Sequence, residues 1–172
     1  MNKKKILALL LITIFFIIAP STISFAKDKS IKIHPYGGEY TVSSNDDIVI
    51  SIGWGTCSEG LQQDYIKSVN NKYLLNNEPL KDAQKKDKDL WMEPYFVENA
   101  PWKDLCIWDV DGVWQMAWKY DLGKLDPGDY ELVWERTYNF NVIDGYDQEG
   151  DGIPDVYGDF TRIVTTIHVV EP

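Results

Sequence analysis

The sequence has few of the residues from which active sites are commonly built. It contains two histidines and two cysteines. Neither His34 nor His168 belongs to a metal-binding spacing such as H-x-x-x-H. A G-x-S-x-G nucleophile motif, a phosphate-binding loop and a dinucleotide fingerprint are also absent from the sequence. We therefore predict a protein that is not an enzyme. A hydrolase that uses two carboxylates is the alternative, because 27 acidic residues offer many such pairs.

Basic residues are scarce as well. The chain has 17 Lys and Arg against 27 Asp and Glu, which gives a net charge of −10. Three of the lysines precede the N-terminal apolar run, so the rest of the chain has 14 basic against 27 acidic residues, a charge of −13. Such a surface repels the phosphates of nucleic acids and of anionic lipids, which argues against both as partners. It is compatible with cation binding and with solubility outside a cell.

One long apolar run is present, and it lies at the N-terminus. Lysines at positions 3–5 precede apolar residues 6–19, and Ser24–Ala26 offers small residues for a cleavage site. This pattern predicts a secretory signal-peptide helix over residues 1–26, with an uncleaved anchor as the alternative. The run is shorter than the roughly 20 residues of a membrane-spanning helix. We expect residues 27–172 to form a single secreted or cell-surface domain with no membrane span after signal cleavage.

The two cysteines, Cys57 and Cys106, have two possible states. In an exported protein we predict that they form a disulfide bond, and two buried free thiols are the alternative. The bond would close a loop of about 50 residues and would contribute about 4 kcal/mol through the entropy of the unfolded chain.

Alternation of apolar and polar residues predicts an all-β fold with two antiparallel sheets packed face to face. The predicted strands cover residues 48–54, 114–122, 130–142 and 163–169. Gly, Pro, Asn and Asp clusters between them predict turns at 35–38, 76–77, 111–112 and 126–129.

Three segments depart from this pattern. Apolar residues spaced by four predict a short helical turn over Leu61–Ile66, followed by a strand. Lys81–Asp89 is rich in charge and is predicted to be a solvated connector. Arg136 occupies an apolar position of its strand. We expect a bulge or a sheet edge to re-aim its side chain; burial beside an acid and a functional role are the alternatives.

The tryptophans fall into two groups. Four of the seven lie on the apolar positions of predicted strands and are expected in the core: Trp54, Trp114, Trp118 and Trp134. Trp91, Trp102 and Trp108 lie in the less regular region 90–110 and could be exposed. Exposed aromatic faces can stack on sugar rings, so these three are the candidate residues of a carbohydrate-binding site.

The segment DGYDQEGDGIPD, Asp144–Asp155, combines acids with glycines and lies in a predicted hairpin loop over 144–159. Calcium takes six to eight oxygen ligands, which a short loop supplies from acids at alternate positions and a glycine at a sharp turn. Counted from Asp147, acids occupy the first, third, fifth and ninth positions and Gly152 the sixth. The predicted calcium ligands are Asp147, Glu149, Asp151, the carbonyl of Ile153, Asp155 and Asp159.

This spacing resembles the aspartate-rich calcium repeats of thrombospondin type 3 modules and the first half of an EF-hand loop. Glu149 stands where those loops have Asp or Asn, and Gly158 stands at the twelfth position, where an EF-hand has Glu. The site would therefore be incomplete, weaker, or completed by Asp144 or Asp159. The side chain of Ile153 is expected to be buried beneath the loop. The alternative is an acidic turn that binds no metal tightly.

The strand pattern over residues 31–170 resembles the immunoglobulin-like and fibronectin-III-like sandwiches of exported bacterial proteins. This resemblance implies a fold but no activity. We predict an exported, extracellular, non-catalytic module, stabilised by calcium, for adhesion or for binding an extracellular protein or glycan. A carbohydrate-binding module and a protease-inhibitor-like sandwich are the alternatives.

Overall fold

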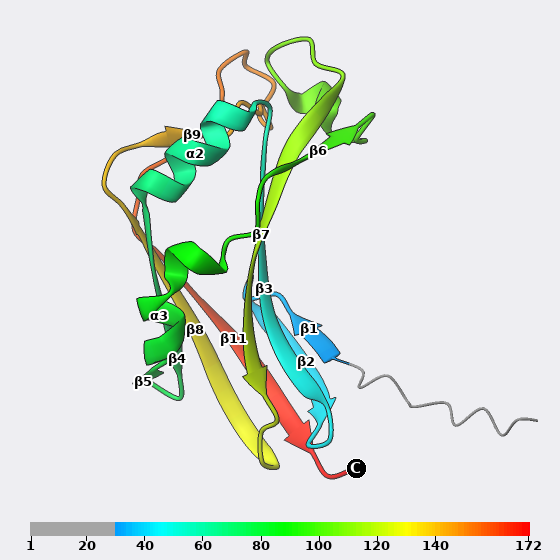
Figure 1. The fold of residues 1–172 in the computed structure, drawn as a ribbon, viewed down its shortest axis with the longest axis vertical. Helices are drawn as coiled ribbons and strands as arrows, with labels where there is room; N and C mark the ends of the chain where they lie inside the picture. The colour runs from blue at the N-terminus through cyan, green and yellow to red at the C-terminus, as the bar shows by residue number, and fades with distance from the viewer. Residues whose placement is uncertain (1–29) are drawn as a thin grey trace, which may run out of the picture.

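The chain folds into two packed β-sheets in a computed structural model that describes residues 30–172 (Figure 1). The first sheet has the order β1 (Ser30–Ile33), β3 (Asp47–Thr56), β7 (Gly112–Gly123), β6 (Tyr95–Glu98). The second has the order β2 (Gly38–Ser43), β11 (Thr161–Val170), β8 (Gly128–Tyr138), β4 (Val69–Leu75), β5 (Glu78–Pro79). The all-β sandwich is thus confirmed. The predicted signal peptide lies outside the described residues.

The N-terminal strands switch between the two sheets. β1 pairs with β3, and after Gly37 and Gly38 the chain continues as β2, which pairs with β11. Both glycines have positive φ, at +93° and +86°, a conformation that L side chains rarely adopt. These two pairings are parallel, unlike the antiparallel ones that join the other strands. Alternation of apolar and polar residues indicates which face of a strand is buried, but not whether the neighbouring strand runs parallel or antiparallel. The sequence pattern therefore could not predict the two parallel pairings.

The loops that join the strands lie at the two ends of the sandwich (Figure 1).

The core lies between the two sheets and follows the predicted alternation. Its fully buried side chains include Ile48, Ile50 and Ile52 of β3, Trp118 of β7 and Leu132 of β8. Of the four tryptophans expected there, Trp118 and Trp134 are buried, and Trp54 and Trp114 are half-buried. A second, smaller cluster comprises Cys57, Ala100, Val113 and Tyr146.

Helix α2 (Glu59–Ser68) is longer than the predicted turn over Leu61–Ile66. It joins β3 to β4 and buries Gln62, Tyr65 and Ser68 at one end of the sandwich. Gln62 helps to fix the position of α2, because its buried side-chain amide donates hydrogen bonds to the carbonyls of Trp54 and Trp114. These two residues lie on the paired strands β3 and β7, so one side chain attaches the helix to both.

The prediction of a solvated connector over Lys81–Asp89 is wrong. The segment forms α3 (Lys81–Lys85) and part of the 3-10 helix η1 (Asp87–Leu90), with Ala83 and Asp87 buried. The Asp87 carboxylate accepts hydrogen bonds from Asn71 and Tyr73. Burial raises the pKa of Asp87, and these hydrogen bonds oppose the rise. The charge count of a segment does not reveal that hydrogen-bond donors from another part of the chain allow one of its acids to be buried.

The expected bulge at Arg136 is also absent. β8 pairs in continuous register with β4 and with β11 through this residue, opposite Asn71 and Thr161. Arg136 therefore keeps the parity of Leu132 and Trp134 and is directed toward the interior.

In the part of the chain that the structure describes, no helix is long and apolar enough to cross a membrane.

Candidate functional site

Two irregular segments meet at the end of the sandwich that lies away from the C-terminus (Figure 1). The first follows β6 and contains the 3-10 helix η2 (Lys103–Leu105). The second leaves β9 (Val142–Ile143) and returns in β10 (Val156–Tyr157), which pair antiparallel. The second segment lies within the predicted acidic loop over 144–159, and the pairing of β10 with β9 limits the loop itself to residues 144–155.

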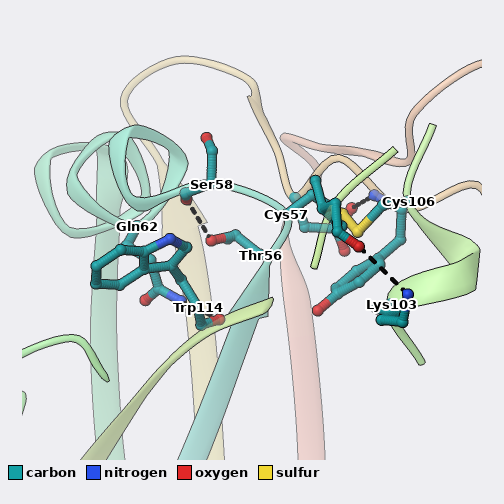
Figure 2. The surroundings of a disulfide bond; sticks show 10 residues. Thr56, Cys57, Ser58, Gln62, Lys103, Cys106 and Trp114 are labelled. Carbon is teal, nitrogen blue, oxygen red and sulfur yellow. Dashed lines mark hydrogen bonds between the residues drawn. A yellow bond between two sulfur atoms is a disulfide. The ribbon is translucent and has the colours of Figure 1, made fainter. Parts of the chain in front are cut away.

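A disulfide bond joins Cys57, directly after β3, to Cys106, directly after η2 (Figure 2). The S–S distance is 2.00 Å and the Cα atoms are 5.8 Å apart. The predicted pairing is confirmed and the alternative of two free thiols is excluded.

The residues around the disulfide are held by short local hydrogen bonds (Figure 2). Thr56 Oγ1 donates to the carbonyl of Ser58 at 2.7 Å, which turns the chain from β3 into α2. The Cys106 N–H donates to the carbonyl of Lys103 at 3.0 Å and closes η2. The disulfide thus joins two turns of the backbone, one after β3 and one after η2, which local hydrogen bonds already order.

The acidic hairpin is attached to both of these turns through its first three residues, Asp144–Tyr146, which we call the root. The Cys57 N–H donates to the Asp144 carbonyl at 2.8 Å, and the Ile107 N–H donates to the Gly145 carbonyl at 3.1 Å. Gly145 has φ +86°, and a Cβ there would lie 2.6 Å from the Trp108 ring. The root needs glycine both for its backbone angle and for the close approach of Trp108.

The Asp144 carboxylate is buried within the root. One oxygen accepts the Tyr146 N–H at 2.9 Å, and the other accepts the Tyr157 hydroxyl at 2.8 Å. Burial raises the pKa of Asp144, and the two hydrogen bonds counter part of this effect. Both oxygens thus have protein partners, so Asp144 fixes the hairpin base.

The remaining residues Asp147–Asp155, which we call the tip, form a separate hydrogen-bonded turn at the surface. The Asp147 carboxylate accepts the backbone N–H groups of Gly150 at 2.6 Å, Asp151 at 3.0 Å and Gly152 at 2.7 Å. These bonds lower the pKa of Asp147. A single carboxylate therefore organises the turn.

The predicted calcium ligands are not gathered around one point. No group of three or more His, Cys, Asp or Glu side chains within residues 30–172 is arranged to hold a metal ion. Glu149, Asp151 and Asp159 are exposed, and Asp155 accepts a hydrogen bond from Gln148 at 2.6 Å. The side chain of Ile153 is 61 % exposed, so the expectation that it is buried beneath the loop is wrong. Calcium binding stays a prediction.

The three candidate sugar-binding tryptophans differ in exposure. Trp91 is buried and packs against Tyr65, so it cannot stack on a ligand at the surface. Trp102 and Trp108 are 38 % and 45 % exposed and flank η2.

A shallow pocket of about 300 Å³ lies beside Trp102. Its lining residues are Gly55, Trp102, Leu105, Gln115, Tyr146 and Gln148. Leu105 is 44 % exposed, whereas Tyr146 is 8 % exposed and belongs to the small core cluster. The sequence predicted Tyr146 as an apolar anchor of the acidic loop but not as a pocket residue. It did not identify Leu105, for which the neighbouring Cys106 was the available signal.

The comparisons with known proteins show no relationship: no protein-family model, no curated protein and no solved structure matches this chain.

Proposed function

We propose that this chain is an exported, non-catalytic β-sandwich module that binds an extracellular ligand through its disulfide-linked end. The observation that carries the proposal is the exposure of Trp102, Leu105 and Trp108 on backbone that is tied down on both sides of Cys106. Large apolar side chains at the surface are typical of binding sites. A disulfide fits an oxidising compartment outside the cytosol.

Rigidity supports binding rather than disorder at this end. The Asp147 N–H donates to the Leu105 carbonyl at 2.8 Å, and Cys106 forms an antiparallel bridge with Tyr146. A ligand that meets side chains on a fixed backbone loses less free energy to ordering than one that meets a mobile loop.

A glycan is the second candidate ligand, because the Trp102 pocket combines an aromatic ring with the polar side chains of Gln115 and Gln148. This mixture of ring face and amide groups is suited to a sugar. A protein ligand would use the same tryptophans as apolar anchors.

The test compares labelled mature protein with the Trp102→Ala/Trp108→Ala double variant on a glycan array and on purified bacterial cell walls. Phe140→Ala is the matched control, because Phe140 is 48 % exposed and lies outside both segments. We expect wild type and control to be retained equally and the double variant to bind at least about tenfold more weakly. Equal retention of all three proteins would refute the proposed binding end.

We further propose that the tip of the acidic hairpin binds calcium and stabilises that end. The spacing of its acids supports this, as does the demand of calcium for carboxylate and carbonyl oxygens. Thermal unfolding in millimolar calcium and in chelator tests it, since a ligand of the native state raises the midpoint. We expect a rise of a few degrees that Asp151→Asn removes. Equal midpoints in calcium and chelator would exclude the metal site.

A further inference from the structure

Arg136 is an inward-directed cation without an acidic partner. The chain has two arginines, and the other, Arg162, forms an ion pair with Glu135 at 2.6 Å. In the described part of this acidic chain, no carboxylate forms an ion pair with Arg136. Its Nε is buried and has no hydrogen-bond acceptor. The buried Nε–H is costly in this state, because it has lost water without gaining an acceptor.

Aromatic rings hold the guanidinium in place. Its central carbon lies 4.8 Å from the centre of the Trp134 ring and 5.4 Å from that of Tyr138. The negative faces of the rings stabilise the charge but accept no in-plane N–H groups. The rings thus fix the plane of the guanidinium.

Two hydroxyl groups lie near Arg136. Tyr65 is fully buried on α2 and Tyr138 is half-buried on β8. The Tyr138 hydroxyl has no hydrogen-bond partner, and the Tyr65 hydroxyl has none apart from the Arg136 guanidinium beside it. Their rings lie 6.3 Å apart. Burial raises the pKa of both tyrosines, and the positive charge of Arg136 opposes the rise, which shows that the three groups share one environment.

The neighbouring rings complete the surroundings. Trp54 stacks on Tyr65 at 4.0 Å, and its indole Nε1 is likewise buried without a partner. Tyr36, which is 52 % exposed, packs against Trp134 at 5.9 Å and provides a solvent-facing side. The cluster therefore offers several hydrogen-bond donors, one positive charge and flat ring faces, and it lacks an anion.

We propose that Arg136, with the hydroxyls of Tyr65 and Tyr138, forms a binding site for a carboxylate-bearing ligand with a ring-shaped body, such as a uronic acid. A carboxylate accepts two parallel hydrogen bonds from a guanidinium edge and more from the hydroxyls. The exposed ring of Tyr36 contacts the apolar face of the ligand ring. This site is separate from the disulfide-linked end and does not depend on ligand binding there.

The presence of just two arginines makes the site directly observable by NMR. In ¹⁵N-labelled mature protein each arginine gives one Nε–H signal, and Arg162 serves as an internal reference. The probes are sodium glucuronate and sodium acetate, with glucose as the neutral ring and sodium chloride as the ionic-strength control. We expect glucuronate to shift the Arg136 signal saturably in the millimolar range and acetate to do so more weakly. Glucose and chloride should leave it unchanged.

Variants test which chemical features of the site matter. The readout is the change in tryptophan fluorescence on titration with glucuronate. Arg136→Lys keeps the charge but loses the two-pronged geometry, so we expect glucuronate to bind about tenfold more weakly. Tyr138→Phe removes one hydroxyl and should weaken binding by a smaller factor. Arg162→Lys is the control and should bind as wild type does.

Circular dichroism and a free-thiol assay confirm that each variant is folded with its disulfide intact. If Arg136→Lys does not fold, Tyr138→Phe and the wild-type titration still decide the question. A wild-type Nε–H signal that responds to no carboxylate, or equally to chloride, would overturn the proposal and assign Arg136 a purely structural role. Equal glucuronate affinity of wild type and Arg136→Lys would overturn it as well.

Discussion

The root and the tip of the acidic hairpin use the same residue type in opposite ways. At the root, Asp144 is buried and its oxygens accept hydrogen bonds from Tyr146 and Tyr157, so it joins β9 to β10. At the tip, Asp147 is close to solvent and accepts hydrogen bonds from the backbone of its own turn. The pKa of Asp144 is raised by burial, whereas that of Asp147 is lowered by N–H donors. Asp144 and Asp147 are three residues apart, yet the first is a buried part of the structure and the second only organises its own turn.

Removal of the disulfide is expected to have the largest effect and to act on the root. The Cys57→Ser/Cys106→Ser variant should lose about 4 kcal/mol of unfolding free energy, because the bond constrains a long loop of the unfolded chain. Denaturant unfolding measures this loss. Amide exchange should accelerate at Ile107, which is bonded to the root, more than at Gly152 in the tip. Uniform acceleration would show that the two parts are not separable.

Two glycines with positive φ provide a matched pair. Gly145 in the root has φ +86° and Gly150 in the tip has φ +75°. A Cβ on Gly145 would lie 2.8 Å from Cys57 Cβ, whereas a Cβ on Gly150 meets nothing within 4 Å. We expect Gly145→Ala to cost about 2 to 4 kcal/mol, from backbone strain plus overpacking, and Gly150→Ala about 1 kcal/mol. Equal losses in thermal unfolding would contradict the tight packing of the root.

The two aspartates give the next comparison. Asp144→Ala leaves the Tyr146 N–H and the Tyr157 hydroxyl without their acceptor, so a loss of about 1 to 3 kcal/mol is expected. Asp147→Ala should leave the unfolding midpoint nearly unchanged, because water replaces the lost acceptor at the surface. Its effect should instead be faster amide exchange at Gly150 and Gly152. A large drop in midpoint for Asp147→Ala would show that the tip supports the fold.

The smallest effect is a pH dependence of opposite sign at the two positions. The raised pKa of Asp144 means that its stabilising contribution is present below the usual Asp pKa and is lost as pH rises through the raised value. The lowered pKa of Asp147 gives a contribution that is present above the usual value and is lost as pH falls through the lowered one. Carboxyl ¹³C titration should place Asp144 above and Asp147 below the usual range. The same midpoint for both would remove the distinction between root and tip.

Several features could be predicted because they depend on local pattern. Alternation along β3, β7, β8 and β11 indicated strands with one buried face, and turn residues separated them. The two cysteines, in a chain predicted to be exported, indicated a disulfide. The hairpin over 144–159 followed from its position between two strands.

Other features could not be predicted because they depend on partners distant in the sequence. Asp87 is buried because Asn71 and Tyr73 lie opposite it, and nothing in the charged segment around it indicates those partners. Trp91 is buried because α2 brings Tyr65 against it. Arg136 was expected to be re-aimed by a bulge, whereas the rings of Trp134 and Tyr138 accommodate it in regular register.

The sequence by itself determined the β-sandwich class, the disulfide and the acidic turn, because alternation, cysteine count and glycine spacing act through neighbours along the chain. The tertiary structure alone decided which acids are buried, which tryptophans face solvent and where the unpaired arginine lies. These properties are set by desolvation and by hydrogen-bond partners from other strands, so the same residue type takes opposite roles at Asp144 and Asp147.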